Sequence, residues 1–439
     1  MTRRSALGLA VAGLVLVVVV SPASGGPDQQ PHPQRYAFYP QAGVLERDLV
    51  VTNFVDVDPL PGIRDFSCGT ITYDGHGGHD TIIRSFREQT IGVPVFAALD
   101  GVVIDAADGF PDKSTSTGSG VPGNFVLLDH GGGHTTMYDH LRQGSVDLPI
   151  GARVRAGRQI GLTASSGNST WPHLHFESRM NGVVFEPSAG ECRPGESGWT
   201  QHVPIRRDLF VRSLTLSARD FRGRAGLPFD EGTRTGTFVA GRRRTIAFRI
   251  ELENQPAQAS YQLRVRSPGG RITGSRTGDF STPFRRASEW WWRLDDVRLD
   301  KIGNWRIVFW MNDVRLASAP FRVVARAAEV VNRPPVPVSV AVEPLEVAGG
   351  HAIRCVVSSP LARRDPDYDV VSYVYRWTLG RRVLRTVTSA ALSDMIPAGA
   401  AAAGGSVTCS VAPSDGRVKG VTVSASVAVA ASPIRRPGH

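Results

Sequence analysis

Three short segments in the first half of the chain gather the residue types that hold a metal ion for hydrolysis. They are HGGHD at residues 76–80, YDHL at 138–141 and HLHF at 173–176. Zinc in hydrolases takes imidazole and carboxylate ligands and leaves one coordination position for water. Such a site also needs nearby bases that move protons. The chemistry that these segments predict is therefore metal-assisted hydrolysis.

The local spacing of the last two segments brings imidazoles onto one surface. His173 and His175 are two apart in a segment typical of a strand, so both project from the same face. His140 stands at the end of another predicted strand and adds a further imidazole. An isolated HxH pair occurs by chance on exposed strands, whereas all three segments together favour a function.

The first segment predicts a turn. His76 and Asp80 are four apart, which would align them on a helix. Gly77 and Gly78 between them disfavour a helix and let the backbone fold closely around an ion.

The surrounding residues, about 66–200, alternate short β-rich runs with glycine-rich turns and predict a β-domain. The runs 93–98 and 102–104 flank Asp100-Gly101, which favours a β-hairpin. No long segment has helical periodicity.

Through the three histidine segments the chain resembles the lysostaphin/LytM-type zinc endopeptidases over about residues 66–190. Arg158 stands where that family usually has Gln. The matching segments are residues 76–80 (HxGxD), 138–141 (YxHL), 173–176 (HLHF), 92–103, 151–161 and 186–187.

The resemblance implies a substrate and a role for each residue. The family cuts peptide bridges in bacterial peptidoglycan. His76, Asp80 and His175 would bind zinc (Zn2+), and His173 would be the general base that takes a proton from water. His140 would stabilise the tetrahedral intermediate or move its proton.

Two further histidines and one loop lie near these segments. His79 and His134 are interpreted as surface residues or as outer neighbours of the site, in preference to ligands. The loop 113–120 is inserted between two core strands. It either lines the substrate groove or is simply solvated.

The four cysteines fit an oxidising compartment. Cys68 and Cys192 bracket the histidine segments, and Cys355 and Cys409 lie together in the last quarter of the chain. We predict the disulfides Cys68–Cys192 and Cys355–Cys409. A four-cysteine zinc site is the alternative, but no CxxC spacing supports it.

The remainder of the chain also predicts strands, so the fold class is all-β: an antiparallel catalytic sheet followed by two β-sandwich (Ig-like) domains. Cys355, Trp377 and Cys409 resemble the Cys…Trp…Cys arrangement of Ig-like or PKD modules. The predicted segments are a signal peptide (1–25), a lead-in (26–65), the catalytic domain (66–200), a β-sandwich (201–327), a linker (328–336), an Ig/PKD-like domain (337–430) and a disordered tail (431–439).

Two smaller patterns leave alternatives open. Trp290 and Trp292 would share one face of a strand, with Trp291 on the other. Filling the sandwich is favoured over stacking on glycan rings. The acidic residues of 365–369 favour a polar turn over a calcium loop, because the glycine and distal glutamate of an EF-hand are missing.

The start of the chain and its charge predict the location. Residues 1–25 combine Arg3 and Arg4, an apolar run and small residues for cleavage, as a signal peptide does. No later stretch spans a bilayer, so we expect an exported protein in the periplasm, the envelope or the medium. The net charge of +10 fits an anionic envelope, whereas the scattered arginines carry no motif for specific nucleic-acid binding.

Together these features predict an exported zinc metalloendopeptidase that hydrolyses peptide cross-links of bacterial peptidoglycan, with β-sandwich modules that contact glycan or the envelope surface. One alternative is a catalytically idle envelope protein that binds wall peptides or activates an amidase. Such proteins usually lack one or more metal residues, and none is missing here. The other alternative is a secreted protease for Gly-rich proteins.

Overall fold

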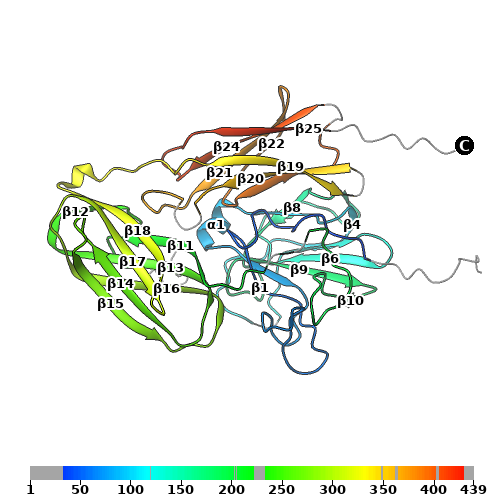
Figure 1. The fold of residues 1–439 in the computed structure, drawn as a ribbon. Helices are drawn as coiled ribbons and strands as arrows, with labels where there is room; N and C mark the ends of the chain where they lie inside the picture. Colours follow the sequence, from blue (N-terminus) through cyan, green and yellow to red (C-terminus); the bar gives the residue numbers. More distant parts are fainter. Residues whose placement is uncertain are drawn as a thin grey trace, which may run out of the picture. The chain divides into compact units, whose positions relative to one another are not determined.

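A computed structural model describes residues 33–118, 120–201, 203, 205–221, 233–347, 350–360, 364–401 and 405–429. The predicted signal peptide and disordered tail lie outside these residues. None of the helices in the described part is long and apolar enough to cross a membrane. Strands make up nearly all of the regular structure, so the predicted all-β class is confirmed (Figure 1).

One antiparallel sheet carries the three histidine segments. Its strand order is β1-β2-β9-β6-β5-β4-β7, with β10 paired to β9. A separate two-stranded sheet pairs β3 with β8, and a short helix, α1, precedes β3. The elements are β1 (Val50–Asn53), β2 (His79–Ile82), α1 (Phe86–Ile91), β3 (Pro94–Phe96), β4 (Gly101–Ala107), β5 (Phe125–Asp129), β6 (His134–Asp139), β7 (Arg153–Val154), β8 (Gln159–Leu162), β9 (His173–Met180) and β10 (Val183–Val184).

Alternation along β9 separates core from site. Leu174 and Phe176 are buried in the core of this sheet together with Tyr138 of β6. His173 and His175 therefore project from the opposite face, which stays partly exposed. The lead-in contributes β1, which pairs with β2 and extends the sheet beside the site.

The hairpin predicted around Asp100-Gly101 is wrong, because its two strands belong to different sheets. β3 pairs with β8, whereas β4 pairs with β5 and β7. Asp100 accepts a hydrogen bond from the backbone N–H of Ala156, 2.8 Å away, and its carbonyl accepts one from His130 Nδ1. The Asp-Gly pair thus turns the chain from one sheet into the next, and hydrogen bonds to distant residues fix that turn.

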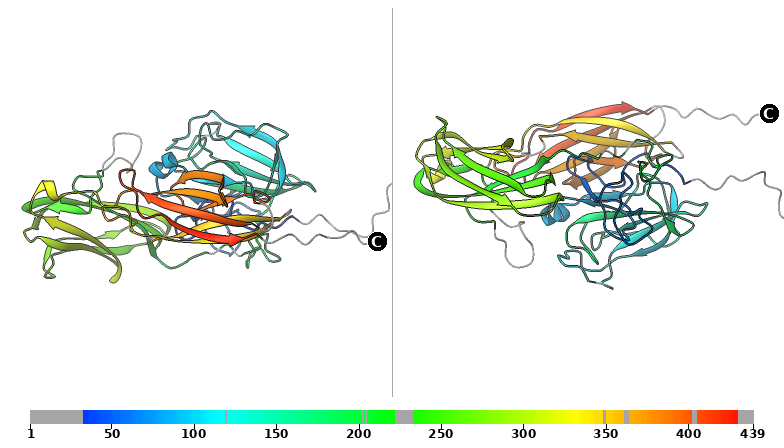
Figure 2. Two further views of the ribbon diagram at one scale, coloured as in Figure 1. Left: turned by 90° about the horizontal axis from the view of Figure 1, so that it is seen from above. Right: turned by 60° about the horizontal axis from the view of Figure 1, so that its bottom comes forward.

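The middle region is a sandwich of two sheets, drawn in green to yellow as two layers in Figures 1 and 2. One sheet has the order β11-β13-β16, and the other has the order β12-β18-β17-β14-β15. Their strands are β11 (Phe210–Ser217), β12 (Thr237–Val239), β13 (Gly241–Gln255), β14 (Ala259–Arg266), β15 (Ile272–Phe280), β16 (Arg285–Leu299), β17 (Gly303–Met311) and β18 (Val314–Val324).

The three consecutive tryptophans lie on β16, as the strand pattern predicts. Trp292 is buried in the core between the sheets, and Trp290 packs against that core. Trp291 lies on the other face and is 40% exposed. Core filling therefore accounts for Trp290 and Trp292.

The last region contains a three-stranded sheet, β19-β20-β23, and a four-stranded sheet, β22-β21-β24-β25. The disulfide Cys355–Cys409 joins β20 to β24, and Trp377 of β21 is buried in the same core. The second predicted disulfide, Cys68–Cys192, also forms, so both pairings are confirmed. The elements are η1 (Ala327–Glu329), β19 (Ser339–Val347), β20 (Gly350–Ser358), β21 (Ser372–Leu379), β22 (Arg382–Ser389), β23 (Ser393–Ile396), β24 (Ser406–Ser414) and β25 (Val423–Ala428).

Candidate metal centre

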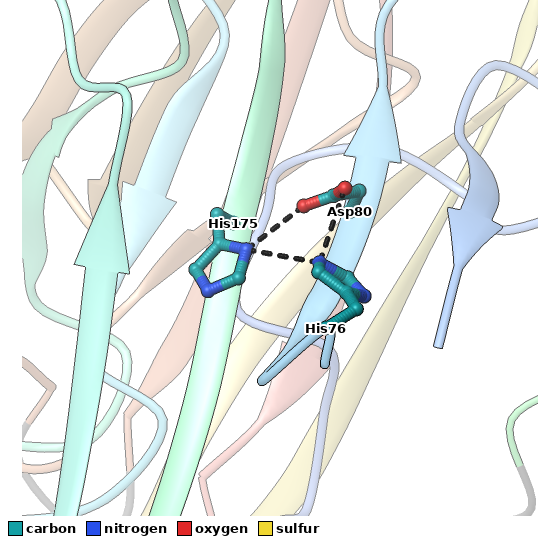
Figure 3. Close-up of side chains that lie close together, drawn as sticks. All are labelled: His76, Asp80 and His175. Atoms are coloured by element: carbon teal, nitrogen blue, oxygen red, sulfur yellow. Dashed lines mark hydrogen bonds and ion pairs between the residues drawn. The ribbon is translucent and has the colours of Figure 1, made fainter. Parts of the chain in front are cut away.

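His76, Asp80 and His175 converge on one point (Figure 3). Asp80 on β2 lies directly opposite His175 on the neighbouring strand β9, and His76 reaches the same point from the loop before β2. One ligand atom from each residue lies within 4.8 Å of the other two. His175 Nδ1 is 2.9 Å from Asp80 Oδ1 and 3.3 Å from His76 Nε2, and His76 Nε2 is 3.2 Å from Asp80 Oδ2.

Hydrogen bonds behind the rings choose which nitrogen faces that point. His76 Nδ1 donates to the carbonyl of Phe54 at 2.7 Å, so Nε2 presents its lone pair. His175 Nε2 lies 3.5 Å from a carboxylate oxygen of Glu177, which leaves Nδ1 for the metal. Partners of this kind orient metal ligands and raise their basicity.

A glycine makes room for the cluster. A Cβ atom on Gly78 would lie 2.8 Å from the ring of His175 and 2.8 Å from the carbonyl oxygen of Phe176. Both contacts are far closer than packed atoms tolerate. Any larger residue in the middle of HxGxD would therefore push the His175 ring out of place.

The electrostatics of the cluster favour a positive charge at its centre. Burial raises the pKa of Asp80, but electrostatic interaction with His173 and hydrogen bonds with His173, His175 and His76 lower it well below its usual range. Burial lowers the pKa of His175, yet hydrogen bonds to Asp80 and Glu177 raise it to about 10. Either a proton or a metal ion would supply the positive charge that these groups favour. Two imidazoles and one carboxylate match the donor set of zinc in hydrolases.

His140 and His173 form a second pair of imidazoles beside the cluster. Their ring centroids are 4.4 Å apart, and His173 Nε2 is 3.5 Å from Asp80 Oδ1. His140 Nδ1 donates to the carbonyl of Ser166 at 2.8 Å, and His173 Nδ1 donates to the carbonyl of Trp171 at 2.7 Å. In the neutral rings, both Nε2 atoms are therefore proton acceptors.

The position of His140 depends on the end of β6. Its backbone has a φ of 62°, which is uncommon for a residue with a side chain. Burial, together with electrostatic interaction with His173 and His175, lowers the pKa of His140 to about 3. His140 is therefore a neutral imidazole at neutral pH.

An open groove of about 320 Å³ borders Asp80, His140 and His173. Thr117 of the inserted loop lines it, and Gly118 N donates to Asn168 Oδ1 on the groove wall. This placement favours the groove-lining interpretation of loop 113–120. The other lining residues are Thr52, Asn53, Tyr73, Ile82, Asn168, Ser169, Thr170 and Trp171.

Sequence reasoning missed two polar neighbours of the cluster. Glu177 stands two residues after His175 on the same face of β9, so strand alternation could have identified it. Asn53 Nδ2 donates to Asp80 Oδ2 at 3.0 Å. Asn53 carries no local signal, because it comes from β1, which pairs with β2 across more than twenty residues of chain.

His79 and His134 are both buried, so they are not surface residues, but neither belongs to the metal cluster found among the described residues, as the preference over a ligand role predicts. His79 Nε2 lies 2.8 Å from a carboxylate oxygen of Glu186 and faces away from the metal cluster. His134 Nε2 lies 2.8 Å from the hydroxyl of Tyr36, and burial lowers the pKa of His134 to about 4. Both histidines tie the sheet to distant segments of the chain.

On an antiparallel sheet, the cluster thus presents two imidazoles and one carboxylate, the donor set of metallohydrolases. Comparison with known families finds that the family described as "Peptidase family M23" matches residues 83–187. His140, His173 and His175 lie within the matched residues, whereas His76 and Asp80 precede them.

Curated relatives agree with the family. The chain is 34% identical over 121 residues to an "Uncharacterized metalloprotease" of Haemophilus influenzae, covering 28% of this chain and 23% of the relative. It is 39% identical over 96 residues to "DD-carboxypeptidase/endopeptidase Mpg" of Neisseria meningitidis serogroup B (22% and 19%). It is 37% identical over 93 residues to "Glycyl-glycine endopeptidase ALE-1" of Staphylococcus capitis (21% and 23%). The chain thus spans about a fifth of the length of these curated relatives.

Proposed function

We propose that the protein is an exported zinc metalloendopeptidase that hydrolyses peptide cross-links of bacterial peptidoglycan. The observation that carries this proposal is the convergence of His76, Asp80 and His175 beside two further imidazoles in an open groove. The names of the curated relatives support the substrate class. The expected location in the envelope or outside it rests on that substrate.

In this proposal His76 Nε2, a carboxylate oxygen of Asp80 and His175 Nδ1 hold the zinc ion. Bound zinc supplies Lewis acidity, which lowers the pKa of water and polarises a carbonyl. Glu177 and the Phe54 carbonyl keep the two imidazoles in the tautomers that binding requires.

His173 and His140 move protons. In the neutral ring of His173, Nδ1 donates to the Trp171 carbonyl and Nε2 carries the free lone pair, so Nε2 takes a proton from the attacking water. The same argument makes His140 Nε2 a proton acceptor in its neutral form. Of the two roles predicted for His140, the hydrogen bond to Ser166 supports the movement of a proton.

The two β-sandwich regions would hold the enzyme on its insoluble substrate by contacting glycan or the envelope surface. A domain that binds the wall raises the local concentration of cross-links without changing the chemistry. This role is separable from catalysis, because none of the five site residues belongs to a sandwich strand.

The test is digestion of purified peptidoglycan by the protein lacking residues 1–25, with and without a chelator, followed by mass analysis of the soluble products. We expect cross-linked muropeptides to be cleaved, and the masses to show whether a D-Ala–diaminopimelate bond or a glycine bridge is cut. His173→Ala should bind zinc stoichiometrically and lose about 10²–10⁴-fold in kcat. Zinc content is measured by elemental analysis.

His351→Ala is the matched control, since it removes an imidazole from β20, outside the catalytic sheet. It should digest peptidoglycan as the wild type does. If wild type and His173→Ala are equally inert while both bind zinc, the enzyme proposal fails and the idle wall-binding protein takes its place. Cleavage of Gly-rich protein without release of muropeptides would instead favour the secreted protease.

A further inference from the structure

The outer face of the five-stranded sheet in the middle sandwich carries a row of arginines. Strand alternation separates them from the core, since Leu263 and Val265 are buried between the sheets while their neighbours on β14 face outward. Arg306 of β17 and Arg322 of β18 likewise lie between buried core residues, although Val308 of β17, which shares the face of Arg306, is itself buried. The arginines of this face, which we call the arginine face, are Arg264, Arg266, Arg306, Arg315 and Arg322.

The arginine face lacks counter-charges. In the part of the chain that the structure describes, none of its arginines forms an ion pair with a carboxylate. Arg264 and Arg266 instead lie over the ring of Trp310, with 5.2 Å and 5.9 Å between guanidinium carbon and ring centroid. Arg266 stands directly opposite Arg306 on the neighbouring strand. Like charges in directly opposite positions destabilise a sheet, so the fold tolerates a cost here.

The abundance of arginine in the chain does not explain the lack of ion pairs, because arginines on the other sheet of the same sandwich do pair with acids. There, Arg212 lies 3.0 Å from a carboxylate oxygen of Glu253, and Arg249 lies 3.1 Å from one of Glu251 and also contacts Glu289. Arginine on one sheet is matched by acids, and arginine on the other is not. A net excess of positive charge is therefore concentrated on one face.

A polar cavity of about 280 Å³ continues the arginine face at the Trp310 end. Gln262, Thr277 and Asn312 line it beside Trp310 and offer amide and hydroxyl groups. Asp279 and Asp313 also line the cavity, at the opposite end of the strands from the Arg266–Arg306 pair. Such groups suit sugar or polyol hydroxyls, which both donate and accept hydrogen bonds.

We propose that the arginine face binds an anionic, phosphodiester-linked glycopolymer of the bacterial wall. The strand positions that carry these arginines are spaced about 6.8 Å apart along a strand and about 4.8 Å apart across strands, so the long side chains of adjacent arginines can reach the two oxygens of one phosphodiester. A polymer that carries its charge in its backbone can lie flat along such a face. The inference rests on the proposed function only for placing the protein in the envelope.

Nucleic acid is the other polyanion with this chemistry. Proteins that bind single strands stack bases on open aromatic rings. Two guanidiniums lie over Trp310, and no recognised nucleic-acid motif accompanies the arginines. The wall polymer is therefore favoured, and nucleic acid becomes an outcome of the test.

The experiment measures binding of purified polyglycerol phosphate to the full protein lacking residues 1–25. The variant Arg264→Gln/Arg266→Gln/Arg306→Gln removes three charges from the arginine face. The matched control Arg376→Gln/Arg381→Gln/Arg382→Gln removes three charges from exposed arginines of the last region. We expect the first variant to weaken binding at least about tenfold and to flatten its salt dependence, with the control changing Kd less than about twofold.

Three results would overturn the inference: no binding by the wild type, an equal loss in both triple variants, or tighter binding of single-stranded DNA of the same charge. Thermal unfolding of both variants shows that they fold. Turnover of a soluble cross-linked muropeptide is measured in parallel and should be unchanged in the first variant. If the wild type cleaves no muropeptide but still binds the polymer, the proposed function is contradicted, whereas the inference about the arginine face is not.

Discussion

Charged and ionisable side chains crowd onto one face of a sheet in two places, and their partners differ. In the metal centre every ring has a fixed hydrogen-bond partner: His76 donates to Phe54, His140 to Ser166 and His173 to Trp171. On the arginine face no described carboxylate forms an ion pair with the guanidiniums.

The difference follows from what each face has to do. A metal ion and a proton acceptor need nitrogen atoms held in one place, and hydrogen bonds from behind provide that. A long flexible polymer needs charge density and tolerates mobile side chains. In our two proposals, the partnered groups carry out the chemistry and the unpartnered groups bind the polymer.

The largest expected effect comes from removing a ligand. Asp80→Asn keeps the shape of the side chain but removes the charge that the surrounding imidazoles share. We expect zinc affinity to fall well beyond the roughly 100-fold that loss of an outer partner costs, and turnover to fall to the level of the chelated protein. Elemental analysis and muropeptide assays measure both. Asp313→Asn, an exposed acid, is the control, and retention of stoichiometric zinc by Asp80→Asn would contradict the assigned ligand set.

A partnered histidine outside the metal cluster gives a prediction about pH. The folded pKa of His134, about 4, lies below its usual 6.5, so its contribution to stability is present above pH 6.5 and is lost as pH falls toward 4. We expect the free energy of unfolding of the wild type to fall by roughly 3 kcal/mol over this range relative to His134→Gln.

Denaturant titrations of the two proteins at several pH values measure this difference. Gln keeps a polar group beside the Tyr36 hydroxyl, so the variant retains a partner for it. Parallel curves for the two proteins would show that His134 accepts a proton equally well when folded.

The next prediction concerns the partner behind a ligand. Glu177→Gln keeps a hydrogen-bond acceptor near His175 Nε2 but removes its charge. We expect zinc affinity to fall about 10–100-fold, with turnover restored at saturating zinc. Competition with a chromogenic chelator measures the affinity. If Glu177→Gln binds zinc as tightly as the wild type, Glu177 pairs with Arg179 but does not support His175 as a ligand.

The smallest effect tests the unpartnered face directly. Arg306→Gln relieves the repulsion with Arg266 and should stabilise the protein by about 0.2–1 kcal/mol at low salt, with the gain vanishing at high salt. Arg212→Gln in the opposite sheet should destabilise the protein by about 3–5 kcal/mol, because buried Glu253 loses the guanidinium that lies 3.0 Å from its carboxylate. If both substitutions stabilise the protein, or both destabilise it, the two sheets do not differ in the way we propose.

Much of the fold and the site could be predicted because the relevant signals are local. Alternation along residues 173–176 separates His173 and His175 from Leu174 and Phe176, and the structure keeps that separation. The cysteines pair within their own regions. The Asp100-Gly101 hairpin failed because a turn signal marks a reversal of the chain but does not specify which strands then pair.

The sequence by itself determined which side chains are candidates to bind zinc and to move protons, because residue type and strand periodicity can be read from a short stretch of residues. Only the tertiary structure decided which nitrogen of each ring faces the site. The deciding acceptors at Phe54, Ser166 and Trp171 are backbone carbonyls, which every residue carries, so no side-chain pattern reveals them. The arginine face has the same physical origin. Alternation turns the arginines outward, but the pairing of distant strands decided that arginine would lie opposite arginine with no acid between them.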